Sequence, residues 1–321
     1  MNGKSDFTWS ALVHLGVRMW GDKNQDDRLH FSEERYRRVT ARMAEIGMNQ
    51  LVIDIGEGIR LPSHPELAVK GSWTPEKVRE EIARLRAMGI EAIPKLNFST
   101  THHFWLGEYA RMVSTSTYYR VCEDVIADVS EIFGRPRFFH LGQDEEAIGE
   151  QPASLVECAV ARQGELWWHD FLRLADQVSQ KGSRPWIWGD VFWHHPEEAP
   201  KRVPKDVLVS NWHYGRVFDE EGPFERAYEK PRLRAYRQID RAGFDQVPCA
   251  TNWVPPYYDT KTNDVNFPGT VKFCRRHVDP KRLKGFLMAP WAHLETDDDL
   301  AFWNRALDLV AQSKRDFENG L

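Results

Sequence analysis

Two adjacent carboxylates, Asp144 and Glu145, are the side chains best placed for chemistry in this chain. They end an apolar stretch, Arg-Phe-Phe-His-Leu-Gly-Gln-Asp-Glu-Glu over residues 137–146, and residues 138–161 contain no Lys or Arg to neutralise them. An apolar strand that ends on acids indicates a catalytic rim, because α/β barrels keep their active sites at the carboxyl ends of the strands. A solvated acidic turn is the competing interpretation, and composition alone favours it.

The reaction that such a pair could support is hydrolysis of a glycosidic bond. A carboxylic acid protonates the leaving oxygen while a negative or nucleophilic group stabilises the positive charge that develops at the anomeric carbon. Two carboxylates in different environments can divide these roles. Adjacent residues are poorly spaced as acid and nucleophile across one bond, so we expect one proton donor and one residue that orients a group of the substrate.

Composition and charge restrict the class of protein. The chain has 321 residues, of which 41% are hydrophobic and 28% charged, and no run of about 18 apolar residues that would cross a membrane. A formal net charge of -5 without a basic block argues against nucleic acid and favours a neutral substrate. The N-terminus lacks a secretory pattern, so a cytoplasmic location is expected, and an oligomer is compatible with the sequence. The four cysteines are scattered, which indicates neither a zinc site nor a disulfide framework.

Eight short apolar stretches alternate with amphipathic helical stretches. Strands are expected over residues 12–19, 49–55, 91–96, 137–146, 185–190, 207–212, 247–253 and 285–291. Ser32 and Thr74-Pro75 mark two helix starts, and the last helix is expected over residues 298–317. Eight such units predict an α/β fold, a (β/α)8 TIM barrel that forms a single domain over residues 1–321. A doubly wound open sheet is the alternative, but no Gly-x-Gly-x-x-Gly follows the first strand.

Closure of the barrel would gather the carboxyl ends of all eight strands at one rim. The residues expected there are Arg18, Glu57, Asn97, Asp144, Glu145, Trp188, Asp190, Trp212, Tyr257, Asp259 and Trp291. The chain has 13 Trp, and indole rings on a cavity rim suit the apolar faces of sugar rings. Packing in the core is the commoner role of any single Trp.

Residues 139–145, Phe-His-Leu-Gly-Gln-Asp-Glu, resemble the signature of family 20 glycoside hydrolases, the β-N-acetylhexosaminidases. In that family His-x-Gly-Gly-Asp-Glu closes the fourth barrel strand. Weaker likeness extends along nearly the whole chain: residues 48–67 resemble the second strand and its loop, and residues 89–94 the third strand. Residues 188–190, Trp-Gly-Asp, are similar to a Trp-Asp-Glu element, and residues 257–259, Tyr-Tyr-Asp, to a Tyr-x-Asp element.

The resemblance implies a retaining, substrate-assisted exo-glycosidase that acts on terminal β-linked N-acetylhexosamine without a metal or cofactor. Glu145 would be the general acid and then the base, Asp144 would orient the 2-acetamido group, and Tyr257 would hydrogen-bond the acetamido oxygen. An acid that stays protonated near neutral pH requires a raised pKa, which we expect for Glu145. The candidate substrate-binding residues are Arg18, Glu57, His140, Trp188, Asp190, Trp212, Asp259, Trp291, His293 and Glu295.

Four departures from the family pattern keep other functions open. Gln143 replaces a small residue, and the His of a Pro-Gly-His element is matched by His102 or His103 with a shift. Trp-Gly-Glu after strand eight becomes Trp-Ala-His at residues 291–293, and the family's usual N-terminal α/β domain is not expected in this chain. One alternative is a glycosidase that uses a separate carboxylate on a sugar without an acetamido group. A non-catalytic sugar-binding relative is another, and a metal-dependent hydrolase is the least favoured.

Overall fold

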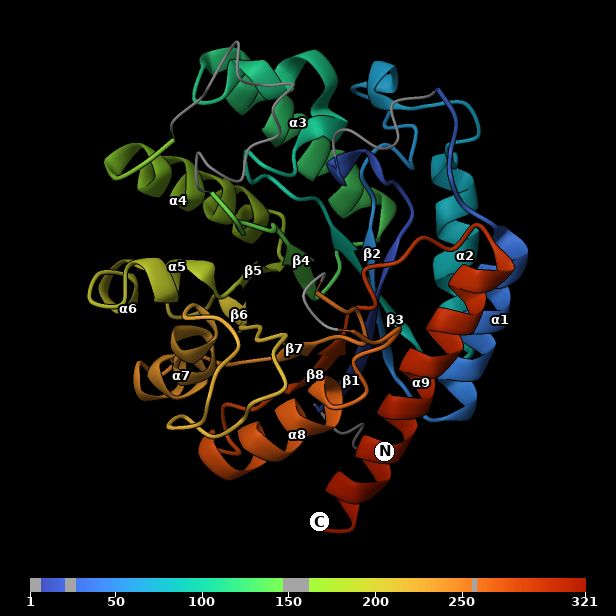
Figure 1. The fold of residues 1–321 in the computed structure, drawn as a ribbon. Helices are drawn as coiled ribbons and strands as arrows, with labels where there is room; N and C mark the ends of the chain where they lie inside the picture. The colour runs from blue at the N-terminus through green and yellow to red at the C-terminus, as the bar shows by residue number, and fades with distance from the viewer. Residues whose placement is uncertain (1–6, 21–26, 147–161, 256–258) are drawn as a thin grey trace, which may run out of the picture.

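Eight parallel strands form one sheet in the computed structural model, which describes residues 7–20, 27–146, 162–255 and 259–321 (Figure 1). The strands are β1 (Thr8–His14), β2 (Gln50–Asp54), β3 (Glu91–Lys95), β4 (Phe138–His140), β5 (Arg184–Trp188), β6 (Leu208–Ser210), β7 (Cys249–Ala250) and β8 (Gly285–Met288). Their order is β6-β5-β4-β3-β2-β1-β8-β7, so each strand lies beside its neighbour in the sequence.

The sheet closes between its two ends, β6 and β7. Parallel bridges join Val209 to Gln246 and Trp212 to Cys249, and the amide of Val247 donates to the carbonyl of Val209 at 3.0 Å. The predicted closed (β/α)8 barrel is therefore confirmed. The first strand begins and ends earlier than expected, and beyond its end the backbone N–H groups of Val17 and Arg18 donate to Glu57.

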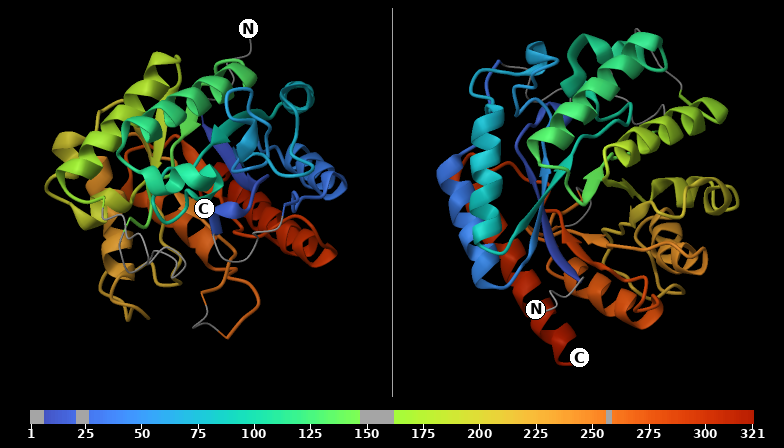
Figure 2. Two further views of the ribbon diagram at one scale, coloured as in Figure 1. Left: turned by 90° about the horizontal axis from the view of Figure 1, so that it is seen from above. Right: turned by 180° about the vertical axis from the view of Figure 1, so that it is seen from behind.

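Helices surround the barrel on its outer side, as the two further views show (Figure 2). They are α1 (Glu33–Glu45), α2 (Pro75–Ala87), α3 (Ser116–Ile132), α4 (Glu165–Gln180), α5 (Asp190–His194), α6 (Ala199–Arg202), α7 (Glu229–Arg241), α8 (Asn266–His277) and α9 (Asp297–Glu318), with 3-10 turns η1 (Arg18–Trp20), η2 (Pro65–Leu67) and η3 (Phe104–Met112). The expected helix starts at Ser32 and Thr74 are confirmed, since each side chain accepts the backbone N–H of the third residue of its helix, Arg35 and Lys77.

Two apolar layers hold the barrel together. The larger one lies between the strands and the helices, and the smaller one fills the barrel interior with residues such as Leu12, Val52, Ile93, Trp186 and Leu287. This is the arrangement expected when alternate residues of each strand face inward and outward. Within the described ranges, no helix combines the length and the apolar character needed to span a membrane.

Candidate active site

The acidic pair lies on an irregular segment, residues 141–146, that begins where β4 ends at His140. Gly142, Gln143 and Glu145 all have left-handed backbone conformations, with φ of 74°, 70° and 51°. Gly142 is required here, because a Cβ at this position would lie 2.0 Å from Oδ1 of Asn97. Outside the strand the two side chains no longer point to opposite faces, so both reach the same imidazole.

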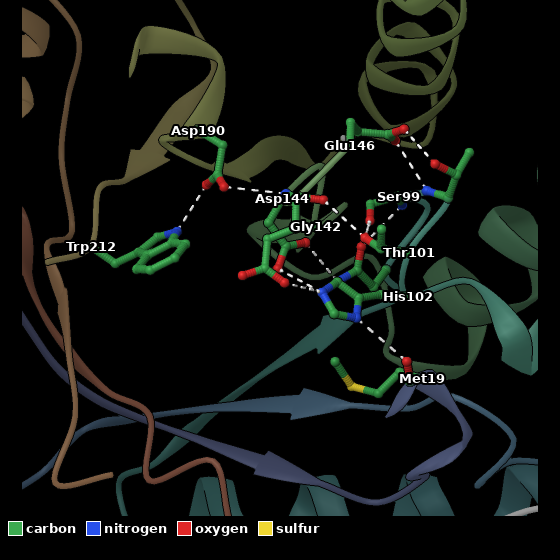
Figure 3. Close-up of polar contacts among 12 residues, drawn as sticks. Met19, Ser99, Thr101, His102, Gly142, Asp144, Glu146, Asp190 and Trp212 are labelled. Atoms are coloured by element: carbon green, nitrogen blue, oxygen red, sulfur yellow. Dashed lines mark hydrogen bonds and ion pairs between the residues drawn. The ribbon is translucent and has the colours of Figure 1, made fainter. Parts of the chain in front are cut away.

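That imidazole belongs to His102, on the loop after β3. Its Nε2 lies 3.0 Å from Oε2 of Glu145 and 3.5 Å from Oδ2 of Asp144, and its Nδ1 lies 3.4 Å from the carbonyl oxygen of Met19 (Figure 3). Asn97 donates from Nδ2 to Oδ1 of Asp144 at 2.8 Å. The loop after β3 thus fixes both carboxylates, and His102 is the histidine that takes this place.

The charge of this trio favours a protonated His102. Burial alone would lower the pKa of its imidazole, but the carboxylates of Asp144 and Glu145 outweigh burial and raise this pKa to about 9. Burial raises the pKa of Asp144 above its usual range. Burial alone would also raise the pKa of Glu145. The hydrogen bond from His102 and its charge outweigh burial, so the pKa of Glu145 is lowered. The expectation of a raised pKa for Glu145 is therefore wrong, because it took no account of a cationic partner.

Asp190, the first residue of α5, lies behind the pair. Its Oδ1 accepts from the backbone N–H of Glu145 at 3.2 Å, and its Oδ2 accepts from Nε1 of Trp212 at 2.8 Å (Figure 3). Burial and the charge of Asp144 raise the pKa of Asp190 well above its usual value. Asp190 thus connects the segment after β4 to the aromatic residues after β6.

The third acid of the stretch, Glu146, faces away from the pair. It accepts from the backbone N–H and the hydroxyl of Thr100, at 3.2 and 2.8 Å, and forms an ion pair with Arg162. Arg162 is completely buried and also donates to the carbonyl of Phe98 at 2.8 Å. These contacts hold the loops after β3 and β4 together. Arg162 was not predicted, because its distance of 16 residues from Glu146 gives no sequence signal.

The predicted tryptophans line the same end of the barrel. Trp188 is buried against His140, with ring centroids 4.5 Å apart, and its ring lies 5.8 Å from that of Trp291. Trp212 stacks on Tyr214 at 4.6 Å. Tyr214 was missed, although an aromatic residue two positions after Trp212 was a usable signal.

A row of ionisable residues crosses the barrel interior along β1 to β4. His14 pairs in register with Asp54, Asp54 with Lys95, and Lys95 with His140. Lys95 and Asp54 form a buried ion pair, and Nδ1 of His14 lies 3.2 Å from Asp54. Burial would raise the pKa of Asp54, but Lys95 and His14 outweigh it and hold this pKa at about 2. The predicted site residue His140 is buried in this row, and its Nδ1 accepts from the amide of Gly142 at 3.0 Å.

Other predicted site residues are engaged by the protein or lie further out. Glu57 accepts from the backbone N–H groups of Val17 and Arg18 at 2.8 and 3.1 Å, so its carboxylate holds the loop after β1. Glu295 accepts from Arg28 at 2.7 Å and lies 2.9 Å from His30. The remaining predicted residues are placed as follows: Arg18 and His293 are half-buried, Asp259 is exposed on the loop after β7, and Tyr257 lies outside the described residues.

The same trio is also the one group of possible metal ligands within the described part of the chain. His102, Asp144 and Glu145 each offer one ligand atom, and these atoms lie within 4.8 Å of one another. A His with two carboxylates is a set that transition metals accept. The hydrogen bond between His102 and Glu145 accounts for the same closeness without an ion.

Comparison with known proteins gives a likeness in fold. No protein-family model and no curated protein matches the sequence. The β-N-acetylhexosaminidase of Bacteroides fragilis matches with a TM-score of 0.67 and 17% identity, over 95% of this chain and 65% of that one. The family 20 β-N-acetylhexosaminidase of Streptomyces coelicolor matches with a TM-score of 0.65 and 15% identity, over 96% and 64%. The chain is similar in fold to family 20 β-N-acetylhexosaminidases.

The similarity to the family 20 enzymes covers the barrel and does not extend to the rest of those proteins. This chain spans 64–65% of the length of the two enzymes compared above. The expected resemblance is confirmed for the fold. Identities of 15–17% leave the roles of individual residues to be argued from the site itself.

Proposed function

We propose that this protein is a retaining exo-glycosidase that hydrolyses terminal β-linked N-acetylhexosamine by substrate-assisted catalysis. The observation that carries the proposal is the contact of one imidazole, that of His102, with both Asp144 and Glu145 at the carboxyl end of β4. The fold similarity to family 20 supports it, and one matched structure, a variant of the Streptomyces plicatus enzyme, holds GlcNAc as product.

In the first step, Glu145 donates a proton to the glycosidic oxygen, and the leaving group departs with it. The carbonyl oxygen of the substrate's acetamido group attacks the anomeric carbon and closes a positively charged ring. Asp144, oriented by Asn97, accepts the acetamido N–H and balances that charge. In the second step, Glu145 takes a proton from water, which attacks the anomeric carbon and reopens the ring with retention of configuration.

His102 resolves the difficulty that the pKa of Glu145 is lowered. His102, with a pKa of about 9, carries a proton at neutral pH and lies 3.0 Å from Glu145. The two groups share this proton and titrate as a pair. A bound sugar removes water from the pair, which disfavours separated charges and moves the proton to Glu145.

Polar atoms without a protein partner support a binding pocket beside the acids. Among the described residues, the side-chain amide of Gln143, Nε2 of His140 and Nε1 of Trp188 are buried without a hydrogen-bond partner. Buried polar groups of this kind are rare unless water or a ligand binds them. In this proposal Trp291, which is half-buried, walls the subsite, and the buried rings of Trp188 and Trp212 support it by packing against Trp291 and Tyr214. The proposed hydrogen bonds to the sugar come from Arg18, Tyr257, Asp259 and His293.

The experiment that tests the function compares Glu145→Gln and Asp144→Asn with wild type on an aryl N-acetylglucosaminide. We expect kcat to fall by about 10²- to 10⁴-fold in each variant, since each loses an interaction made in the transition state. Glu76→Gln, an exposed position on α2, is the control and should leave kcat unchanged.

Three outcomes would contradict the proposal. Unchanged hydrolysis by Glu145→Gln would remove its role as acid. Equal hydrolysis of an aryl glucoside, which lacks the acetamido group, would favour a separate carboxylate such as Asp190. Saturable binding of N-acetylglucosamine without any turnover would identify a sugar-binding relative.

A further inference from the structure

Arg232, in the first turn of α7, has its guanidinium group against the aromatic wall of the site. Its Cζ lies 3.8 Å from the ring centroid of Trp212, 4.5 Å from that of Trp193 and 4.6 Å from that of Tyr228. Trp212 is the residue that donates to Asp190 behind the acidic pair (Figure 3). Arg232 therefore belongs to the surroundings of Glu145, although neither its position nor its sequence context suggested this.

The aromatic cage of Arg232, formed by Trp193, Trp212 and Tyr228, is held in place by a side chain outside it. Oδ1 of Asn211 accepts from Nε1 of Trp193 at 2.6 Å, and its Nδ2 donates to the backbone carbonyl of Arg232 at 2.9 Å. Trp193 and Trp212 pack edge to face, with centroids 4.7 Å apart. The guanidinium group is thus oriented in advance, which lowers the entropy cost of binding through it.

Arg232 differs in its partners from three other cations of α7, Lys230, Arg234 and Arg237. Lys230 and Arg234 pair with Glu221 at 3.2 and 3.3 Å, and Arg237 pairs with Glu220. Within the described ranges, Arg232 has no ion pair, and none of its side-chain N–H groups donates a hydrogen bond. Stacking occupies the faces of the guanidinium group and leaves its N–H edge free, and this edge matches the oxygens of a carboxylate or sulfate.

The charge of the site makes such a cation useful for one class of substrate. A negatively charged saccharide would approach the carboxyl groups of Asp144, Glu145 and Asp190, and Glu145, whose pKa is lowered, would repel it. The positive charge of Arg232 offsets the negative charge of the site, since it acts to lower the pKa of both Glu145 and Asp190.

We infer that Arg232 binds an oxyanion, a carboxylate or sulfate group, carried by the saccharide substrate on the side of the leaving group. The inference rests on the proposed function, because the leaving group is the part of the substrate that Glu145 must reach. The substrate class is then an N-acetylhexosamine linked to an acidic sugar.

The test compares the kcat/KM of two substrate pairs, each with an anionic and a neutral member. One pair is an N-acetylglucosaminyl-glucuronic acid and its glucose counterpart, and the other is an aryl N-acetylglucosaminide with and without a 6-O-sulfate. Arg232→Gln should lower the anionic-to-neutral ratio of the first pair by about tenfold or more, and Arg232→Lys by less, because Lys keeps the charge and loses the planar fork. The control Arg173→Gln removes a guanidinium group that stacks on Tyr119 at 4.7 Å, away from the site, and should leave the ratio unchanged.

Each result decides the inference. A lower ratio in the second pair alone would keep the oxyanion and overturn its placement on the leaving group, and unchanged ratios in both pairs would overturn the inference.

If no substrate is turned over, the proposed function fails, and calorimetric titration with glucuronate then tests whether Arg232 binds an oxyanion. Binding that weakens in Arg232→Gln would support it, and equal or absent binding would overturn it. Far-UV circular dichroism of each variant verifies that it is folded.

Discussion

The two halves of the barrel contribute different chemistry to the same rim. Strands β1 to β4 and their loops supply ionisable groups: the row of His14, Asp54, Lys95 and His140, in which Asp54 and Lys95 form an ion pair, with His102 and the acidic pair at its end. Strands β5 to β8 supply rings, namely Trp188, Trp212, Tyr214 and Trp291. A sugar between these halves would meet hydrogen-bonding and proton-donating groups on one side and apolar faces on the other.

The pairing of the strands differs in the same way. Five residue pairs join β1 to β2 and five join β2 to β3, whereas β6 and β7 meet through isolated bridges. Buried charges tolerate little displacement, because the gain from an ion pair exceeds its desolvation cost only at good geometry. Stacked rings keep most of their contact energy through small shifts. The comparison teaches that the buried ion pair of Asp54 and Lys95, which needs fixed positions, lies on the strands joined by the most residue pairs.

The largest expected effect comes from removing the buried ion pair between Lys95 and Asp54. Lys95→Met leaves the carboxylate of Asp54 buried without its cation and should lower the free energy of unfolding by about 3–5 kcal/mol. Urea denaturation measures this change. The double variant Lys95→Met, Asp54→Leu removes both charges and should lose less than the single variant. Equal losses would show that the pair is not what makes Lys95 important.

The next effect concerns His102 and pH. Its pKa in the folded protein, about 9, lies above the ordinary value of 6.5, so its contribution to stability is complete below pH 6.5 and is lost as pH rises through 9. The stability difference between wild type and His102→Gln should therefore shrink by about 3 kcal/mol from pH 6 to pH 10. Urea denaturation at the two pH values gives this difference. A difference that stays constant would mean that His102 does not hold a proton between the acids.

The smallest effect is expected in the aromatic half. Trp212→Phe keeps a ring against Tyr214 and removes the indole N–H that Asp190 accepts, which should cost about 1–3 kcal/mol. Urea denaturation checks the stability, and hydrolysis of an aryl N-acetylglucosaminide should fall by up to about tenfold. Trp193→Phe is a matched control, since its indole N–H is accepted by Asn211 and not by Asp190. If both variants lose the same activity, the hydrogen bond to Asp190 has no role of its own.

The sequence predicted the barrel and the place of the acidic pair for physical reasons. Eight apolar stretches of strand length, separated by capped helices, allow few other arrangements, and a strand that ends on acids places them at a known edge. The sequence did not predict which residues of different loops contact each other. His102 and His103 are adjacent, yet His102 reaches the acids, while burial lowers the pKa of His103 to about 3.

Contacts between residues far apart in the sequence could not be predicted either. Asp54 and Lys95 each occur in an apolar stretch, and neither stretch shows that the two residues lie in register. The lowered pKa of Glu145 follows from His102, 43 residues away. Glu57 was expected at the rim as a ligand of the substrate, but two backbone N–H groups of the loop after β1 occupy its carboxylate. The order of the strands in the sequence predicts which strands are adjacent in the barrel. It does not predict which side chains from different loops contact each other, because that depends on the three-dimensional course of the loops.

The joint between β6 and β7 has a consequence for how the barrel deforms. Trp212 itself lies in one of the bridges that close the sheet, Trp212 to Cys249. Small thermal openings should begin at this joint, where few backbone bonds must break, and should expose the amide of Cys249 to solvent exchange long before that of Val52 on β2. The side with the aromatic rings is therefore expected to deform more easily than the side that holds the ion pair of Asp54 and Lys95.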